Sequence, residues 1–224
     1  MEAVVFDMDG VIFDTEKLIL KSWENVGNQF HIRNTKETCQ KCFGTTNDVS
    51  REIFKVEYGQ DFPYDEYKEH VRKLFNQYLK ENGMPLKEGV KEILQYLKEN
   101  GYKIGLASST RTQIVKEELE MAGIKQWFDI VLGGDLLKNS KPEPDIYLKA
   151  CENLGIEAKN AYAIEDSYNG IRSAFRAGMK PIMVVDLLPP TEEMSEKTVA
   201  IKKNLFEVIN LLENSKKAKQ IVQK

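Results

Sequence analysis

Cysteine is scarce in this chain of 224 residues. There are three cysteines, too few for the disulfide framework of a small secreted domain. A basic excess is also missing, because 32 lysines and arginines stand against 35 aspartates and glutamates and give a formal net charge of −3. Proteins that bind the phosphate backbone of nucleic acids usually carry such an excess. We therefore expect no nucleic acid among the partners of this protein.

Long apolar runs are missing as well. No run approaches the roughly 20 apolar residues that a membrane-spanning helix needs. The opening segment, MEAVVFDMDG, has an acid at position 2 and lacks the basic region of a secretory signal. We therefore expect no membrane partner and a reducing, cytoplasmic location. The composition, 42% hydrophobic and 30% charged, is typical of a protein that can bury a core.

Short apolar segments alternate with helical patterns along much of the chain. The apolar segments have no polar face, which is typical of strands that are covered on both faces in a parallel sheet. Amphipathic helical patterns lie between them, and several are followed by a glycine. This alternation predicts an α/β fold with a doubly wound parallel sheet. The predicted strands are Ala3–Phe6, Lys103–Ala107, Phe128–Leu132, Ala161–Glu165 and Pro181–Val185.

One connection is far longer than the few residues that usually join a strand to the next helix. Roughly eighty residues follow the first strand before the core pattern resumes, and they contain helical patterns of their own. We therefore expect two domains: a catalytic core of residues 1–14 and 82–224, and an inserted all-helical domain of residues 15–81. Because the insertion leaves the core directly after the first strand, it should lie over the carboxyl edge of the sheet, where open α/β sheets bind ligands.

Four short polar stretches lie just beyond predicted strands and should meet at that edge. Each has an ordinary structural explanation when it is taken alone, such as a turn, a helix cap or a solvated lysine. The stretches are Asp7-Met8-Asp9-Gly10-Val11, Ala107-Ser108-Ser109, Lys141-Pro142-Glu143-Pro144 and Glu165-Asp166-Ser167.

Taken together, the four stretches favour phosphoryl chemistry. Carboxylates that are packed together without a cation repel one another and take up protons. A hard divalent ion such as Mg²⁺, which takes oxygen ligands, resolves that conflict. The same ion, a lysine and the N-terminus of a helix all favour a bound phosphoryl group. The pattern therefore predicts a Mg²⁺ site at the carboxyl edge of the sheet.

In order and spacing, these stretches resemble the four motifs of the haloacid dehalogenase-like hydrolase superfamily. The resemblance covers residues 1 to about 186, and the helical insertion resembles the C1-type α-helical cap of one subfamily, close to sugar-phosphate phosphatases and β-phosphoglucomutase. It implies a Rossmann-like core with a cap domain. It also implies a Mg²⁺-dependent phosphatase that hydrolyses a small phosphorylated metabolite, with a sugar phosphate favoured, through an aspartyl-phosphate. The alternative is β-phosphoglucomutase-type phosphoryl transfer between positions of a hexose phosphate.

The resemblance also implies catalytic roles for individual residues. Asp7 would be the nucleophile. Asp9 would be the general acid for the leaving alcohol and then the general base for water, which requires a raised pKa. Ser108 and the backbone N–H of Ser109 would hold the transferring phosphoryl oxygens, and Lys141 would neutralise charge between Asp7 and those oxygens.

A metal-binding set is implied in the same way. Mg²⁺ would be bound by the carboxylates of Asp7 and Asp166 and by the backbone carbonyl of Asp9. Glu165 would assist, either directly or through water. The second acid of the first motif, Asp9, argues against a true dehalogenase, which needs no acid for a leaving group at that position.

The resemblance leaves the choice between phosphatase and mutase open. The cap loop Gly44-Thr45-Thr46-Asn47 offers no cation where the mutase has a phosphate-binding arginine, and Ile19 stands where the mutase has a histidine. Both differences favour hydrolysis, but Arg111 could supply a cation from the core side. The candidate substrate-binding residues are Thr15, Gly44, Thr45, Asn47, Ser109 and Arg111.

The remaining unusual motif is a C-x-x-C, Cys39-Gln40-Lys41-Cys42. A structural zinc site needs about four ligands, and the rest of the chain supplies only Cys151, His31 and His70 as thiol or imidazole ligands. We interpret the motif as part of the packing of the inserted domain. We expect the protein to be a monomer or a weak dimer.

Overall fold

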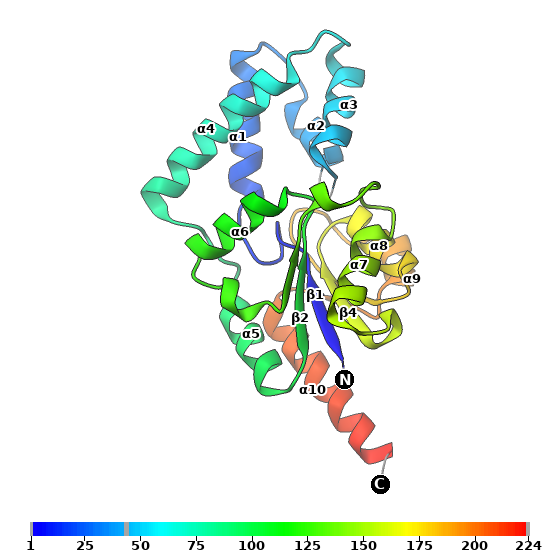
Figure 1. The fold of residues 1–224 in the computed structure, drawn as a ribbon. Helices are drawn as coiled ribbons and strands as arrows, with labels where there is room; N and C mark the ends of the chain where they lie inside the picture. The colour runs from blue at the N-terminus through cyan, green and yellow to red at the C-terminus, as the bar shows by residue number, and fades with distance from the viewer. Residues whose placement is uncertain (1, 43–44, 223–224) are drawn as a thin grey trace.

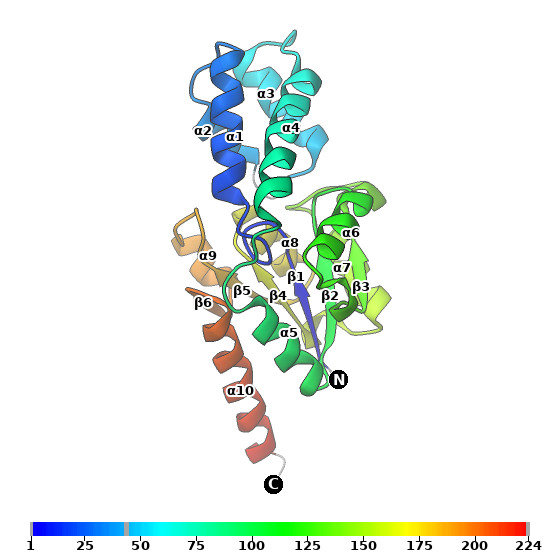
Figure 2. The same cartoon turned by 90° about the vertical axis from the view of Figure 1, so that its left-hand side faces the viewer.

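A six-stranded parallel sheet forms the centre of the core in the computed structural model, which describes residues 2–42 and 45–222. Strands β2, β1 and β4 lie at its centre (Figure 1), and the full strand order is β3-β2-β1-β4-β5-β6 (Figure 2), so the prediction of a doubly wound parallel sheet is confirmed. The strands are β1 (Ala3–Phe6), β2 (Lys103–Ala107), β3 (Ile130–Leu132), β4 (Ala161–Glu165), β5 (Lys180–Val184) and β6 (Ala200–Lys202).

Two apolar layers cover the faces of this sheet. β1 lies between β2 and β4, and all four of its residues are fully buried. Because side chains alternate along a strand, Val4 and Phe6 belong to one layer and Ala3 and Val5 to the other. The first layer is completed by α5 (Val90–Glu99), α6 (Thr112–Met121) and α10 (Leu205–Val222), and the second by α7 (Asp145–Leu154) and α8 (Tyr168–Arg176).

Shorter elements complete the core. Helix α9 (Glu192–Lys197) packs against α8, and single turns of 3-10 helix occur at Lys125–Trp127, Gly134–Leu136 and Ala158–Asn160. Strand β3 begins at Ile130 and not at Phe128, as the apolar run predicted, because the chain is still leaving the turn at Lys125–Trp127. The half-exposed edge strand β6 was not predicted.

Four helices between β1 and α5 pack around an apolar cluster of their own. They are α1 (Glu16–Gln29), α2 (Thr35–Cys42), α3 (Asn47–Tyr58) and α4 (Tyr64–Asn82). The Trp23 ring packs edge-on against Phe54 at 5.0 Å and Tyr67 at 5.9 Å between centroids. The Tyr67 hydroxyl donates to the Trp23 carbonyl at 2.7 Å. These helices stand above the carboxyl edge of the sheet, with α1 beside α4 (Figure 2).

The two segments that join these helices to the core lie side by side. Phe13 and Leu86 form an antiparallel bridge, and the Asp14 N–H donates to the carbonyl of Pro85 at 3.0 Å. Lys87 then pairs with Asp14 at 2.8 Å and with Asp186, just after β5, at 2.7 Å. The two segments that connect the helical unit to the core are therefore held together at one place on the core.

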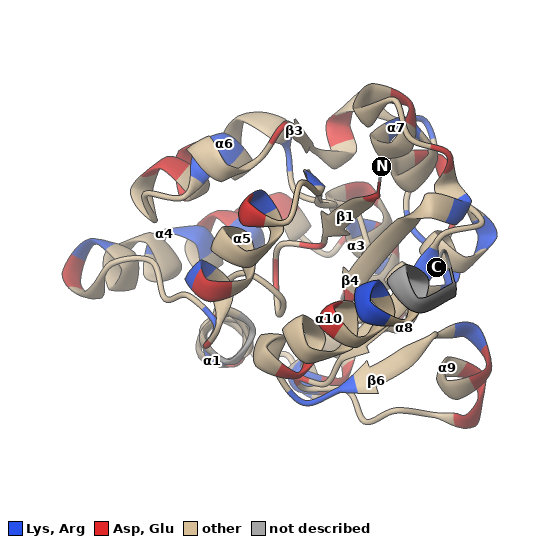
Figure 3. Cartoon of the chain, turned by 90° about the horizontal axis from the view of Figure 1, so that it is seen from below, with Lys and Arg blue, Asp and Glu red and all other residues tan. Residues whose placement is uncertain are grey.

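Charges of both signs are spread over the surface. In the view of Figure 3, lysine and arginine alternate with aspartate and glutamate along several helices. Within the described part of the chain, no helix combines the length and the apolar character that are needed to cross a membrane.

Candidate active site

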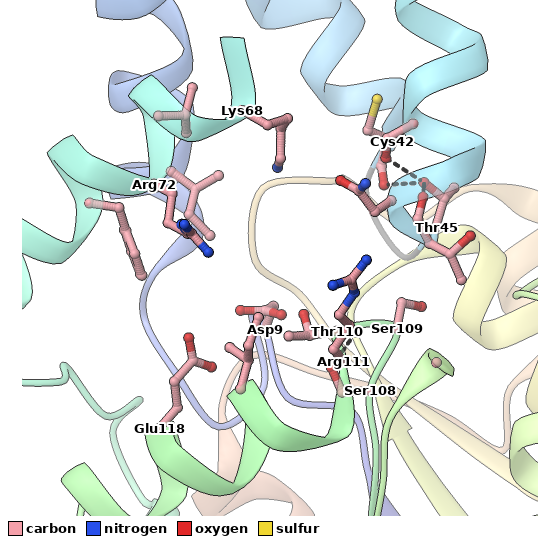
Figure 4. Close-up of a pocket in the computed structure, with 18 of the residues that line it drawn as sticks. Asp9, Cys42, Thr45, Lys68, Arg72, Ser108, Ser109, Thr110, Arg111 and Glu118 are labelled. Atoms are coloured by element: carbon pink, nitrogen blue, oxygen red, sulfur yellow. Dashed lines mark hydrogen bonds between the residues drawn. The ribbon is translucent and has the colours of Figure 1, made fainter. Parts of the chain in front are cut away.

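The four polar stretches lie together at the carboxyl ends of neighbouring strands. Asp7 follows β1, Ser108 follows β2 and Glu165 ends β4, and these strands are adjacent in the sheet. The floor of a cleft of about 1210 Å³ is lined by Asp7, Ser108 and Asp166, and Glu165 is buried beneath it. The opposite wall comes from α1 to α4 (Figure 4). A ligand on this floor is therefore enclosed by both parts of the chain.

A lysine connects two carboxylates beneath the floor. The Lys141 ammonium donates to Asp7 Oδ1 at 2.5 Å, to Glu165 Oε1 at 2.6 Å and to the Ala107 carbonyl at 3.2 Å. These three bonds use all the N–H groups of the ammonium, which is almost completely buried. Burial alone would lower the pKa of Lys141, but the two carboxylates more than offset it and raise the pKa. The lysine therefore stays charged and holds its position.

The two aspartates of the first stretch occupy different environments. Burial raises the pKa of Asp7 to about 8, against the opposing effect of Lys141, so its carboxylate form near neutral pH requires a further cation beside it. Lys141 bonds to the Asp7 carboxylate through Oδ1, and Asp7 lines the cleft, so Oδ2 is the oxygen left toward a ligand. Burial also raises the pKa of Asp9, although the Thr15 hydroxyl, which donates to Oδ1 at 3.2 Å, lowers it. A raised pKa shifts Asp9 toward the protonated form that a general acid needs.

Glu165 is held by five donors. Its Oε1 accepts from Lys141 and from the Tyr147 hydroxyl at 2.8 Å. Its Oε2 accepts from the N–H groups of Asp166 and Ser167, each at 3.2 Å, and from the Ser167 hydroxyl at 3.0 Å. The side chain is fully buried. The carboxylate is thus fixed by the protein itself, and Tyr147, which the sequence indicated only as a core residue, belongs to the network.

Gly170, in the first turn of α8, makes room for this carboxylate. A Cβ at this position would lie 1.8 Å from Glu165 Oε1. We expect Gly170→Ala to lower the free energy of unfolding by about 1–3 kcal/mol through overpacking, although alanine is the better helix former by about 1 kcal/mol. Urea unfolding tests this, with Asn169→Ala in the same turn as the control. A Gly170→Ala protein as stable as the wild type would contradict the expectation.

The loop after β2 is held by hydrogen bonds of its own. Ser108 is buried, and its Oγ accepts from the Thr110 N–H at 3.0 Å. The N–H and the hydroxyl of Thr112, at the start of α6, both donate to Asp135 Oδ1 at 2.7 Å. The Thr112 N–H is therefore not available to an anion. Ser108 and Ser109 still line the cleft.

An acidic group suited to a metal ion lies at the same place. Carboxylate oxygens of Asp7, Glu165 and Asp166 lie within 4.8 Å of one another, and all three residues are buried. Hard oxygen donors at this spacing fit a divalent cation such as Mg²⁺. Because the oxygens of Glu165 are already engaged, Asp7 and Asp166 are the better carboxylate ligands.

The candidate substrate-binding residues fall into three groups. Thr45, Asn47, Ser109 and Arg111 line the cleft. Thr15 does not: it is 1% exposed and bonds to Asp9, so its expected substrate contact is replaced by a contact with Asp9. Gly44 lies outside the described residues.

Several charged residues that line the cleft were missed from the sequence, and three of them are labelled in Figure 4. Lys68 and Arg72 project from α4 and Glu118 projects from α6 (Figure 4). Lys68 and Arg72 are four residues apart and flank the buried Tyr67 and Val71, so they lie on one side of the helix. The sequence could have indicated, from this spacing, that Lys68 and Arg72 share one face of the helix. It does not show whether that face meets the core.

Comparisons with known proteins place this site in context. A model of haloacid dehalogenase-like hydrolases matches residues 4–184. The chain is 30% identical over 217 residues to a phosphorylated carbohydrates phosphatase of Thermotoga maritima, covering 95% of this chain and 98% of the relative. It is 28% identical to a beta-phosphoglucomutase of Bacillus subtilis, covering 80% and 81%. A crystal structure of beta-phosphoglucomutase from Clostridium difficile shares the fold, with a TM-score of 0.79 over 99% of both chains at 24% identity.

Proposed function

The chain belongs to the haloacid dehalogenase-like hydrolase family, and from this premise we propose that it is a Mg²⁺-dependent phosphatase that hydrolyses a small phosphorylated metabolite, with a sugar phosphate favoured, through an aspartyl-phosphate. That the chain is an enzyme of the phosphatase class follows from the family and its phosphatase relatives. The observation that carries the proposal is the buried array of Asp7, Lys141 and Glu165, in which Lys141 bonds to Asp7 Oδ1 and leaves Asp7 Oδ2 for a ligand. We also propose that residues 15–81 act as the cap domain.

In the first step, Asp7 Oδ2 attacks the phosphorus of the substrate. The ester P–O bond breaks, and the alcohol oxygen takes the proton of Asp9 as it leaves. Lys141 holds Asp7 Oδ1, which fixes the direction of the free oxygen and offsets negative charge near the phosphoryl group. The Ser108 hydroxyl and the Ser109 N–H are the proposed donors to the phosphoryl oxygens. The product on the enzyme is an acyl phosphate on Asp7.

In the second step, Asp9 is a carboxylate and acts as the base. It takes a proton from a water molecule whose oxygen attacks the phosphorus. The bond between Asp7 and phosphorus breaks, inorganic phosphate leaves, and both aspartates return to their initial states. The Thr15 hydroxyl, bonded to Asp9 Oδ1, keeps the acid at the leaving-group side in both steps.

The donor set fits Mg²⁺, and we propose that the carboxylates of Asp7 and Asp166 and the Asp9 carbonyl hold it. When bound, the ion would supply positive charge next to the phosphoryl oxygens. Glu165 takes a different part in this proposal: it positions Lys141 and the loop at Asp166 and Ser167.

Metal dependence and substrate turnover are tested together. The holoenzyme should release phosphate from at least one member of a panel of sugar, polyol and glycolate phosphates. Chelation with EDTA should lower that rate at least about a hundredfold, because the charge on the phosphoryl group is left unbalanced, and Mg²⁺ should restore it. The Asp166→Asn variant should need more Mg²⁺ for half-maximal rate, with Asp61→Asn on the cap surface as the control. Full activity in EDTA, or no turnover of any substrate, would contradict the proposal.

A mutase remains the second candidate. Arg111, Lys68 and Arg72 line the cleft, so cations do face the substrate although the described part of the cap loop has none. The similarity to the Bacillus subtilis beta-phosphoglucomutase favours the same candidate. The two functions differ in product: β-glucose 1-phosphate gives glucose 6-phosphate with a mutase, and glucose and phosphate with a phosphatase.

A further inference from the structure

Two charged side chains in the cleft have no part in the proposed steps. Lys68 points into the cleft from α4, and Glu118 points toward it from α6 on the opposite side (Figure 4). Both are half-buried. The Lys68 ammonium lies 4.3 Å from the centroid of the Trp23 ring, and neither side chain has a hydrogen bond or ion pair with another residue that the structure describes.

Both side chains are close enough to Asp9 to affect it electrostatically. Lys68 is among the groups that lower the pKa of Asp9. Burial raises the pKa of Glu118 to about 8, and the Asp9 carboxylate adds to that effect. In Figure 4, Lys68 lies above Asp9, and Glu118 lies below it and to one side. The two side chains therefore flank the position of Asp9, which is where the alcohol part of a phosphate ester leaves.

Half-buried polar groups without a partner are unfavourable, and a ligand that supplies hydrogen bonds relieves them. The Lys68 ammonium offers only donors, whereas Glu118, with a pKa of about 8, is mostly a neutral acid near pH 7 and can both donate and accept. A hydroxyl group can accept from Lys68, and a neighbouring hydroxyl can form hydrogen bonds with Glu118. A carboxylate or a second phosphate would also accept from Lys68. Among the described residues that line the cleft, however, acidic ones outnumber basic ones, which disfavours a second anionic group.

We infer that Lys68 and Glu118 are specificity-determining residues that bind hydroxyl groups of the leaving alcohol from opposite walls of the cleft. The preferred substrate class is then a phosphate monoester of a neutral, polyhydroxylated alcohol, such as a sugar or a polyol. This inference rests on the proposed phosphatase function and narrows its substrate.

The pair allows one other use. If the cleft narrows, Lys68 and Glu118 can approach each other and form a hydrogen bond or an ion pair that holds the cap closed. A closing contact of this kind would act on every substrate alike. A contact with the hydroxyls of the leaving group would act only on substrates that carry them, so the two uses are separable.

The experiment compares four substrates on the Mg²⁺-loaded full chain. They are a hexitol 6-phosphate, a hexose 6-phosphate, phosphoglycolate, which carries a carboxylate, and para-nitrophenyl phosphate, which carries no hydroxyl. In the wild type, kcat/KM for the better of the first two should exceed that for phosphoglycolate at least about tenfold. The first two substrates also distinguish a polyol from a sugar.

Two variants and two matched controls then test the residues. Lys68→Met should lower the ratio of kcat/KM for the hydroxylated substrate to that for para-nitrophenyl phosphate by about ten- to a hundredfold, the usual effect of a lost hydrogen bond to a charged group, and Glu118→Met should lower it by about three- to tenfold, the usual effect of a lost neutral hydrogen bond. Lys73→Met and Glu120→Met lie on the same helices but not in the lining of the cleft, and they should leave the ratio within about twofold of the wild type.

Each other outcome has a distinct meaning. An equal loss on both substrates would overturn the inference in favour of a closing contact, and an unchanged ratio would overturn it outright. A wild type that prefers phosphoglycolate would show that Lys68 binds a carboxylate and would overturn the inference of a neutral substrate. A wild type that hydrolyses none of the four would contradict the proposed function, and the inference would fall with it.

Discussion

Replacing Asp7 by asparagine should lower turnover of a phosphate ester by about 10⁴-fold or more, the scale that is typical of a lost nucleophile. Asparagine has the same shape as aspartate, but its amide does not attack phosphorus. The fold should survive, because the side-chain oxygen of the introduced asparagine can still accept from Lys141, and Glu165 still balances the charge of that lysine. Removing a buried charge also removes a desolvation penalty.

Phosphate release and chemical unfolding, measured on the same preparation, distinguish a loss of catalysis from a loss of folding. Asp61→Asn, which replaces an exposed aspartate of the cap, is the matched control and should behave like the wild type in both. An Asp7→Asn protein that is folded and keeps more than about a tenth of the wild-type rate would show that another group attacks the phosphorus.

The second large effect is expected on stability. Lys141→Met should lower the free energy of unfolding by about 3–5 kcal/mol at about pH 10, the usual result of removing one member of a buried ionic group. The substitution leaves Asp7 and Glu165 buried, close together and without their shared cation. Activity should be lost as well, since Asp7 is no longer oriented.

The pH dependence of this loss follows from Asp7. Burial and the neighbouring Glu165 raise the folded-state pKa of Asp7 to about 8 in the wild type, and Lys141 opposes them, so the pKa of Asp7 rises further in Lys141→Met. The folded variant then holds a proton on Asp7 at pH values where the folded wild type has lost it, so the penalty is largest above the raised pKa and is relieved as the pH falls through it. Relative to the wild type, Lys141→Met should therefore regain stability between about pH 10 and about pH 8.

Urea unfolding at both pH values measures this. Lys149→Met, which removes an exposed lysine paired with Glu152 on α7, is the control and should cost less than about 1 kcal/mol. If Lys141→Met were as stable as the wild type at about pH 10, the buried ionic array would not have the energetic role assigned to it.

The sheet was predictable because its central strands are buried on both faces. Ala3–Phe6, Lys103–Ala107 and Ala161–Glu165 occur in the structure with the bounds that the apolar runs indicated. The edge strand of the sheet was harder to predict. Strand β6 has three half-exposed residues, too few to form a pattern, so no periodic signal in the sequence marks it.

The buried faces of the helices were predicted less reliably than the strands. Met121 and Phe175 fit the apolar spacing of α6 and α8 but are 59% and 48% exposed, because they lie off the face that the buried Leu119 and Ala174 turn toward the core. Leu86 has the spacing of the apolar face of α5 but lies in the linker, where it bridges Phe13. Spacing alone does not indicate where a helix begins.

The floor of the site was predictable for a topological reason. Asp7, Ser108 and Glu165 are far apart in the chain, but parallel neighbouring strands end at one edge, so the residues that follow them must meet. The supporting residues were not predictable in this way. In the sequence, Tyr147 is an ordinary core position of a helix, and nothing shows that its hydroxyl bonds to Glu165. The need for glycine at position 170 becomes clear only in the structure, where Glu165 occupies the space of a side chain.

The cleft wall was not predictable, because it depends on how two separate parts of the chain face each other. Lys68 and Glu118 lie on helices from different parts of the chain, and each resembles a solvated charge in the sequence. Their position beside Asp9 follows from the placement of α4 over α6, which no local pattern encodes.

The most direct test of the central claim is to look for phosphate on Asp7. In an Asp9→Asn variant, para-nitrophenyl phosphate needs no acid to leave, whereas hydrolysis of the acyl phosphate lacks its base, so the covalent species should accumulate. After acid quenching and digestion, mass spectrometry should find one phosphoryl group on the peptide that contains Asp7, removable by hydroxylamine and missing when Asp7→Asn is added. A burst of nitrophenolate with no phosphoryl group on that peptide, or with the group on another residue, would contradict the account.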